Sequence, residues 1–374
     1  MTSHKPRTIK VGFTEAHGMP AEQFHYPPEG VEFSFLQRLT PGSRVLQSPI
    51  KGFMSEFNFA DCDIIESVIS PVATALPWVY SLACYQEPLA FSFFGLPSPK
   101  PIRSLYMERL LRRDNCKKLV FWSQAGLNTL HSYGKVTDSK ILQKSVVVYP
   151  AVREIDAAAQ HKDSDSISIL FSGDFFRKGG ANVIDAFEQL QKSYSNIQLR
   201  LCCDEKIDFN TSNIALKEKY LSKIRSNKNI VFGRVPREVM IGSILPATDI
   251  YLLPTYTEAF GFAILEAMAF GIPVISTNYM AIPEIIEAGE TGFMIDIEKF
   301  DTENMFKGYV VDNIPEEFNR YMTQQLHNYL GQLIDSAALR QNLGVASIEV
   351  ARTKFSFSRR NQQMRAIYEE ALEK

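Results

Sequence analysis

The second half of this chain alternates short apolar runs with longer amphipathic segments, and this alternation limits the folds open to it. Runs such as YLLP and PVIS are apolar throughout, which is typical of parallel strands covered by helices on both faces. Strands joined by crossover helices form an α/β fold with a parallel sheet. We expect strands at 166–173, 196–202, 229–233, 249–254, 273–277 and 292–296, and helices at 180–194, 236–247 and 259–270.

The first half repeats this alternation less regularly. Its apolar runs predict strands at 9–15, 31–36, 63–69, 77–83, 117–123 and 145–150. We therefore expect two doubly wound, Rossmann-like domains. Because open parallel sheets bind ligands beyond the carboxyl ends of their strands, two such domains facing each other would place a substrate cleft between them.

A polar stretch at 151–166 lies between the two sets of strands and predicts the connection between the domains. The N-terminal domain then covers 1–150, where we expect the acceptor to bind, and the C-terminal domain covers 151–354. The last helix, at about 355–374, follows a capping Ser and carries an apolar stripe. We expect that helix to pack back on the N-terminal domain.

The composition is that of an ordinary globular protein. It is 45% hydrophobic and 22% charged, and a net charge of -2 gives no drive toward nucleic acid. No apolar run reaches the roughly 18 residues of a spanning helix, and the N-terminus lacks the apolar core of a secretion signal. The cysteines form no CxxC pair and predict neither a disulfide framework nor a metal site. We expect a cytoplasmic protein.

The segment DIYLLPTYTEAFGFAILEAMAFGIPVIST, at 249–277, carries most of the functional information. It predicts a strand, a loop, a helix that ends at Gly271, and a second strand. Glu266 is the only charged residue of that helix. A buried carboxylate needs hydrogen bonds, and the vicinal hydroxyls of a ribose supply them. The structural alternative is that Glu266 pairs with a core Lys or Arg.

Glu258 precedes the same helix, and a separation of about two turns would return it to the side of Glu266. Phe260, Gly261 and Phe262 would form the helix start, whose free N–H groups and positive dipole end suit an anionic ligand. The alternative is that Glu258 only caps the helix. The combination of two carboxylates with this helix start favours a ligand site.

A second set of candidate residues lies in SGDFFRKGG, directly after the strand expected at 166–173. Arg177 and Lys178 follow Gly173 near the carboxyl end of that strand, and two glycines then open a helix. Two cations beside exposed backbone donors predict a diphosphate site. An RKGG turn is also common in solvated surface loops, so this motif alone leaves both interpretations open.

Together these motifs resemble glycosyltransferase family 4, the glycosyl transferases group 1, which are retaining enzymes with the GT-B fold of two facing Rossmann-like domains. The resemblance rests on two glutamates with seven residues between them, on FG after the first, on EAMAFGIPVI around the second and on a downstream GETGF. SGDFFRKGG is similar to the basic phosphate loop of the family. VFGRVPREVM, at 231–240, is similar to the stretch whose backbone faces the nucleotide base.

The resemblance covers about 166–300 and implies an enzyme that moves a sugar from a UDP- or GDP-linked donor to a saccharide or lipid-linked acceptor. It implies retention at the anomeric carbon and no cofactor. Glu258, Arg177 and Lys178 take catalytic roles, the two cations by stabilising the leaving diphosphate. The implied donor-binding residues are Gly173, Gly233, Arg234, Phe260, Gly261, Phe262 and Glu266.

The N-terminal half departs from the family pattern. PWVYSLACYQEP, at 77–88, stands where the family has a recognisable histidine, and it offers Glu87 as a polar residue. No DxD-like pair or His/Cys cluster suggests a metal, so we expect activity without a divalent ion. A noncatalytic nucleotide-sugar sensor or partner subunit is the alternative from another class. A glycosidase fits worse, because hydrolysis gives no reason for a phosphate site.

The segment MERLLRRDNCKK, at 107–118, reads as an amphipathic helix with five basic residues. Such a face suits anionic lipid headgroups and predicts peripheral contact with the inner membrane face. A solvated helix face is the plain alternative. The sequence gives no indication of an oligomeric state.

Overall fold

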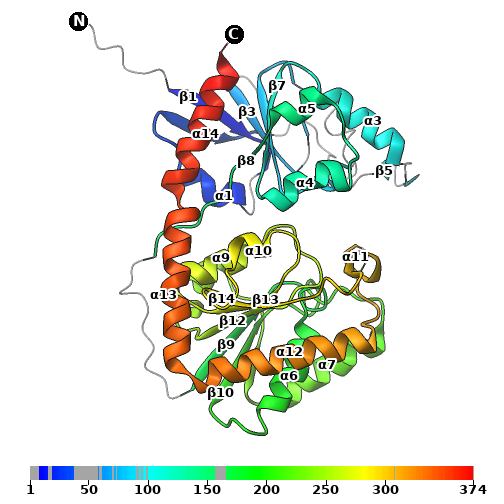
Figure 1. Ribbon diagram of the computed structural model, residues 1–374, viewed down its shortest axis with the longest axis vertical. Coiled ribbons are helices and arrows are strands. Elements are labelled where there is room, and N and C mark those ends of the chain that lie inside the picture. Colours follow the sequence, from blue (N-terminus) through cyan, green and yellow to red (C-terminus); the bar gives the residue numbers. More distant parts are fainter. Residues whose placement is uncertain are drawn as a thin grey trace, which may run out of the picture. The chain divides into compact units, whose positions relative to one another are not determined.

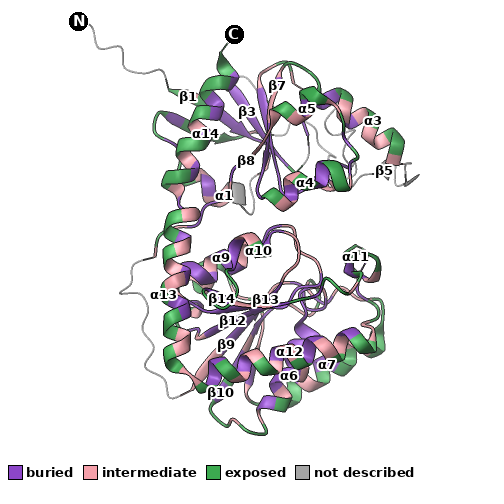
Figure 2. Ribbon diagram, viewed as in Figure 1, coloured by how far each residue is buried: buried purple, intermediate pink, exposed green. Residues whose placement is uncertain are grey.

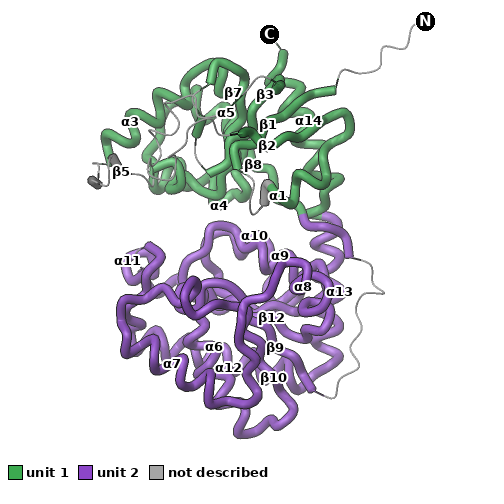
Figure 3. The backbone as a smooth tube through the Cα atoms, turned by 180° about the vertical axis from the view of Figure 1, so that it is seen from behind, with its two compact units in different colours: residues 1–151, 354–374 green, residues 152–353 purple. Residues whose placement is uncertain are grey.

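The computed structural model describes residues 8–15, 19–37, 58, 61–69, 71–72, 74–89, 92–93, 96–97, 100–155, 166–306 and 308–373 (Figure 1). The chain divides into two compact units, which are coloured separately in Figure 3. Unit 1 contains Met1–Ala151 and Lys354–Lys374, and unit 2 contains Val152–Thr353. Each unit is built on one parallel six-stranded sheet, which confirms the α/β fold predicted from the alternation of apolar runs.

The sheet of unit 1 has the strand order β2-β1-β3-β4-β7-β8, and every pairing in it is parallel. β3 and β4 are buried along their whole length, because the sheet is covered on both faces. Its strands are β1 (Ile9–Phe13), β2 (Val31–Phe35), β3 (Ile64–Val68), β4 (Trp78–Leu82), β7 (Cys116–Phe121) and β8 (Ser145–Val147).

Helices and a short hairpin complete unit 1. They are α1 (Met19–Phe24), the 3-10 turn η1 (Glu87–Leu89), the hairpin of β5 (Ser92–Phe93) and β6 (Leu96–Pro97), α3 (Lys100–Leu111), α4 (Gln124–Ser132), α5 (Ser139–Lys144) and the C-terminal α14 (Phe357–Leu372). α14 begins after Ser356, whose hydroxyl accepts the N–H of Arg359. Leu372, at its far end, is exposed.

α14 packs back on the sheet of unit 1. Met364 and Ile367 share an apolar core with Val11 and Ile64 of the sheet. The Tyr368 hydroxyl also donates to Glu66, a fully buried carboxylate on β3 that accepts a second hydrogen bond from Ser81. The last helix is therefore held by apolar packing together with a buried polar contact.

The sheet of unit 2 has the order β11-β10-β9-β12-β13-β14, again fully parallel. Numbered along the chain this is 3-2-1-4-5-6, the order of the dinucleotide-binding fold, whose ligand crevice lies where the winding direction reverses. The strands are β9 (Ile167–Ser172), β10 (Ile197–Cys202), β11 (Ile230–Phe232), β12 (Ile250–Leu253), β13 (Val274–Thr277) and β14 (Gly292–Ile295). The reversal falls between β9 and β12.

Buried strands and partly exposed helices give unit 2 its layers (Figure 2). α6 and α12 pack together and join β9 and β10 in one apolar core. The helices are α6 (Gly180–Leu190), α7 (Ile214–Ser226), α8 (Arg237–Val239), the π-turn η3 (Met240–Ile244), α9 (Phe262–Ala269), α10 (Ile282–Ile285), α11 (Thr302–Met305), α12 (Glu316–Asp335) and α13 (Ala337–Lys354).

Three of the expected helices were wrong in extent. The helix expected at 236–247 is a single turn, α8, followed by the π-turn η3. The helix expected at 259–270 begins at Phe262, because Gly261 before it has a left-handed φ of 111°. The amphipathic helix expected at 107–118 ends at Leu111, and strand β7 begins at Cys116.

Candidate active site

Two loops of unit 2 meet at the carboxyl ends of β9 and β12, where the winding of the sheet reverses. The backbone N–H of Tyr256 donates to the carbonyl of Arg177 at 2.9 Å, which ties the loop after β12 to the loop after β9. Gly179 lies where they touch. A Cβ there would sit 2.2 Å from the carbonyl oxygen of Pro254, and its φ of 80° is left-handed. Only glycine fits this position without displacing backbone.

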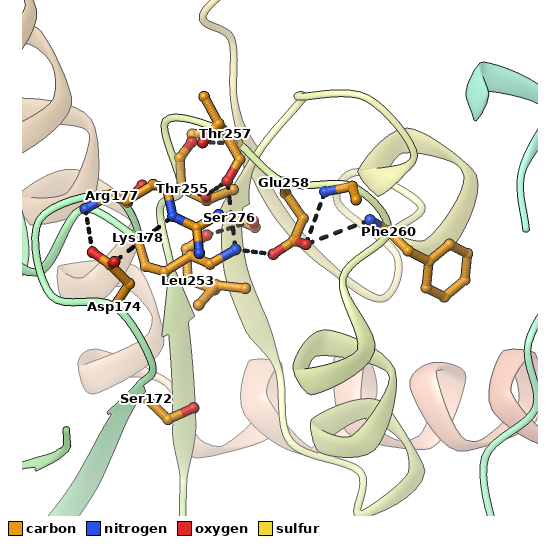
Figure 4. A network of polar contacts seen from close by, with 12 residues as sticks. Ser172, Asp174, Arg177, Lys178, Leu253, Thr255, Thr257, Glu258, Phe260 and Ser276 are labelled. Carbon is orange, nitrogen blue, oxygen red and sulfur yellow. Dashed lines mark hydrogen bonds and ion pairs between the residues drawn. The ribbon is translucent and has the colours of Figure 1, made fainter. Parts of the chain in front are cut away.

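The contact between these loops brings Lys178 and Glu258 together (Figure 4). Their side chains form an ion pair and are only 11% and 16% exposed. The Lys178 ammonium also donates to the carbonyl of Thr257 at 3.4 Å. The other oxygen of the Glu258 carboxylate accepts the N–H groups of Ala259, at 2.9 Å, and Phe260, at 3.4 Å. The sequence indicated both charged residues but not their direct pairing.

Burial and charge act in opposite directions on this pair. Burial alone would raise the pKa of Glu258, but Lys178 and the Ala259 N–H outweigh it and lower that pKa below its ordinary value. Burial also lowers the pKa of Lys178, although Glu258 raises it. Three hydrogen bonds to the Glu258 carboxylate, two of them from backbone N–H groups, favour its charged form.

Arg177 is held by Asp174, a residue that the sequence reasoning missed. The Asp174 carboxylate accepts the backbone N–H of Arg177 at 3.0 Å. Its other oxygen lies 3.8 Å from the Nε of the Arg177 guanidinium. Asp174 is only 8% exposed and accepts a further hydrogen bond from the Asn210 side chain. The spacing in SGDFFRK, with Asp three residues before Arg, was the available signal, since Asp commonly accepts a backbone N–H at this separation.

Glu266 lies on α9, and its surroundings differ from the prediction. The side chain is 20% exposed rather than buried, and it forms an ion pair with Arg237, which is itself 50% exposed. Arg237 is thus a surface cation of α8 and no core residue. Tyr251, whose hydroxyl bonds Ser172 at 2.8 Å, has a pKa raised by burial first and further by the charges of Glu266 and Glu258. Both carboxylates therefore act on one buried hydroxyl at this edge of the sheet.

The expected helical spacing of the two glutamates was wrong. Glu258 lies in the loop before α9, so the two-turn argument does not place it beside Glu266. The N–H groups of Ala259 and Phe260 are engaged by the Glu258 carboxylate instead of lying free. Gly261 and Phe262 form the true start of α9. In the described part of the chain, no contact joins Glu266 directly to Arg177 or Lys178.

The remaining candidate residues follow β9 and β11, the strands on either side of β10. Gly173 follows β9 and Gly233 follows β11, with left-handed φ values of 99° and 149°. Their N–H groups donate to carbonyls of β10 between them, at 3.3 Å and 3.1 Å respectively. Arg234 comes next along the chain and is exposed. These positions lie at the same carboxyl edge as the Arg177 and Lys178 loop.

The basic residues expected on one helix at 107–118 do not form one face. Arg112 lies in a turn and pairs with Glu108 and Asp138. Lys118 lies on β7 and pairs with Glu370 of α14. Carboxylates thus neutralise part of this basic segment.

The described residues contain neither a metal-binding cluster nor a membrane-spanning helix. No group of three or more His, Cys, Asp or Glu side chains in the ranges given above is arranged to hold a metal ion. No helix that the structure describes is both long and apolar enough to cross a membrane.

The donor-site residues lie in a part of the chain that matches one protein family. Residues 152–305 match the family Glycosyl transferases group 1. This matched region contains every candidate residue of the donor site, from Gly173 to Glu266.

Curated relatives match part of the chain. An uncharacterized 41.2 kDa protein in the cps region of Klebsiella pneumoniae is 25% identical over 208 residues, 52% of this chain and 51% of its own length. D-inositol 3-phosphate glycosyltransferase of Corynebacterium diphtheriae is 29% identical over 138 residues, 37% of this chain and 26% of its own. The chain therefore spans about half or less of the length of these relatives.

Solved structures match the fold over nearly the whole chain. Sucrose-phosphate synthase from Thermosynechococcus elongatus has a TM-score of 0.64 at 15% identity, covering 97% of this chain and 98% of its own. Anabaena HepE in complex with UDP and glucose has a TM-score of 0.62 at 15% identity, covering 96% and 98%. WaaG, a glycosyltransferase involved in lipopolysaccharide biosynthesis, scores 0.59 at 16% identity and covers 96% and 99%. The fold is that of the GT-B glycosyltransferases, and identities this low carry the fold alone.

Proposed function

We propose that this protein is a retaining, metal-independent glycosyltransferase that moves a sugar from a UDP- or GDP-linked donor to an acceptor hydroxyl in glycan or glycoconjugate biosynthesis. The observation that carries the proposal is the cluster of Arg177, Lys178 and Glu258 at the switch point of a 3-2-1-4-5-6 sheet. This cluster lies inside the residues matched by a glycosyltransferase family. HepE, whose fold is similar, was solved with UDP and glucose, which supports a UDP-linked donor.

The chemistry of the cluster suits the departure of a diphosphate. Breaking the bond between the sugar and the diphosphate builds negative charge on the leaving oxygens, and catalysis requires positive charge placed there beforehand. Arg177 supplies a planar set of donors, and Lys178 supplies a compact ammonium beside it. Asp174 and the loop contact at Gly179 fix the two cations on a rigid edge of the sheet.

Glu258 has two roles in this proposal. Its carboxylate stays charged beside Lys178 and accepts two backbone N–H groups, so it fixes the loop that faces the transferred sugar. The same carboxylate can accept hydrogen bonds from sugar hydroxyls, which lowers the cost of holding the sugar in a reactive position. Positive charge from Arg177 and Lys178 can neutralise the diphosphate without a divalent ion.

Glu266 and the edge at Gly233 are proposed to hold the nucleoside. Glu266 is accessible, and its ion pair with half-exposed Arg237 is of the kind that contributes little to stability. Ribose hydroxyls can therefore compete for its carboxylate at small cost. Gly233 has no atom within 4 Å of the position of a Cβ, and this leaves space for a base beside the backbone.

A thermal-shift screen against UDP, GDP, ADP and their sugars tests the donor site. A ligand that binds only the folded state raises the melting temperature as its concentration exceeds its Kd. We expect a UDP- or GDP-linked compound to raise it, and we expect Lys178→Met to abolish the shift. The control is Lys228→Met, an exposed position just before β11 and so at the opposite end of the strands, and it should keep the shift. A screen without any shift would contradict the proposal.

A further inference from the structure

An exposed aromatic side chain lies against the proposed phosphate-binding cation. The Arg177 guanidinium lies over the Tyr309 ring in a cation–π contact, with its Cζ 4.8 Å from the ring centroid. Tyr309 is 71% exposed, so burial in a core does not explain its position. It lies beyond the residues matched by the family, which end at 305. The contact is therefore a feature of this chain that the family match does not describe.

The segment that carries Tyr309 is anchored to the loop after β10. The Asp312 carboxylate accepts the Ser212 N–H and the Thr211 hydroxyl, and its carbonyl accepts the Asn213 side chain at 2.8 Å. These contacts hold the backbone three residues beyond Tyr309.

A second connection runs from this segment to the other partner of Arg177. The Val311 N–H donates to the carbonyl of Asn210 at 2.9 Å. The side chain of Asn210 in turn donates to Asp174, the carboxylate next to the Arg177 guanidinium. One anchored segment thus contacts Arg177 twice, directly through Tyr309 and indirectly through Asp174.

The two contacts leave the terminal nitrogens of Arg177 available. The Cζ of Arg177 lies over the Tyr309 ring, and the Asp174 carboxylate lies 3.8 Å from Nε. Among the residues that the structure describes, neither terminal nitrogen of Arg177 makes a hydrogen bond. These two nitrogens can therefore donate to a phosphate through two parallel hydrogen bonds, the arrangement that a guanidinium favours.

We propose that Tyr309 is a positioning residue that holds the Arg177 guanidinium in the orientation that binds the diphosphate of the donor. This inference rests on the proposed function, because it requires Arg177 to bind phosphate. An exposed cation–π contact contributes about 0.5–1 kcal/mol, which corresponds to a two- to fivefold change in affinity. The aromatic ring, rather than the hydroxyl, is the part that acts.

Calorimetric titration with inorganic pyrophosphate tests this without knowledge of the nucleotide. We expect Tyr309→Leu to weaken pyrophosphate binding about two- to fivefold. Tyr309→Phe keeps the ring and should bind like the wild type. Arg177→Gln should weaken binding more than Tyr309→Leu does, because it removes the charge itself.

The double variant Arg177→Gln/Tyr309→Leu separates positioning from a general effect on the loop. If Tyr309 acts through Arg177, adding Tyr309→Leu to Arg177→Gln changes the affinity no further. An unchanged affinity in Tyr309→Leu, with a clear loss in Arg177→Gln, would overturn this inference and leave the proposed function standing. Equal binding by the wild type and Arg177→Gln, or none by either, would overturn both.

Discussion

At the residue scale, the site depends on charges that are paired before any ligand binds. Lys178 is paired with Glu258, Arg177 with Asp174, and Glu266 with Arg237. The first pair is the least exposed of the three, so removing either partner would leave a charge with few water contacts. Pairing of this kind holds these side chains in position before the transition state forms.

Glu87, in unit 1, is a carboxyl group with no cationic partner among the residues that the structure describes. It follows β4, and its carboxylate accepts the N–H of Ala83 at 3.1 Å. Burial raises the pKa of Glu87 to about 7, although backbone hydrogen bonds from Ala83 and Cys84 lower it. The folded protein therefore holds a proton on Glu87 that the unfolded chain releases at lower pH.

This pKa predicts a pH dependence of stability. Because the folded pKa lies above the unfolded one, ionisation favours the unfolded chain, and stability falls as the pH rises from about 4.5 to about 7. Glu87→Gln should remove up to about 3 kcal/mol of this loss, measured by urea unfolding at pH 5 and pH 8. Glu369→Gln, an exposed position on α14, is the matched control and should keep the wild-type dependence. The same dependence in both variants would contradict the prediction.

At the element scale, the strands were predictable and the helix ends were not. β9, β12 and β13 lie within the predicted ranges, because a strand buried on both faces shows an unbroken apolar run. The start of α9 depends on the backbone angle of Gly261, and the short α8 depends on the π-turn that follows it. Those are local conformations that apolar periodicity does not record.

The site residues divide in the same way. Glu258, Arg177 and Lys178 were predictable, because charged residues directly after apolar strands fall at the carboxyl edge of a parallel sheet. Asp174, Asn210 and Tyr309 were not predicted. The spacing of Asp174 and Arg177 was a signal for the first of these. The contacts of Asn210 and Tyr309 depend on how the loop after β10 and the segment beyond α11 fold against the loop after β9, and spacing within one segment does not show this.

The meeting of the two site loops gives a prediction at this scale. In Gly179→Ala the new Cβ would lie 2.2 Å from the Pro254 carbonyl oxygen. The alanine would also have to adopt a left-handed φ of 80°. Gly289→Ala has nearly the same φ of 81° but no atom within 4 Å. We expect about 1 kcal/mol of destabilisation for Gly289→Ala and about 3 kcal/mol for Gly179→Ala, measured by urea unfolding. Equal losses in the two variants would show that the loops do not need this close approach.

At the scale of the whole molecule, both units place their polar side chains at the carboxyl ends of parallel sheets. Unit 2 carries the cations, Glu258 and Glu266, and the family match covers its residues 152–305. Unit 1 carries Glu87 and the returning helix α14, and it lies outside the residues of that match. We therefore propose that unit 2 recognises the donor and that residues of unit 1 select the acceptor.

The most direct test of the account is donor turnover by the purified protein in the presence of a chelator. With the UDP- or GDP-sugar that stabilises the protein, we predict steady release of the nucleoside diphosphate in EDTA. Glu258→Gln should lower that rate by about a hundredfold while the variant remains folded. Binding of the nucleotide sugar with no turnover in any condition would contradict the account and would indicate a nucleotide-sugar sensor.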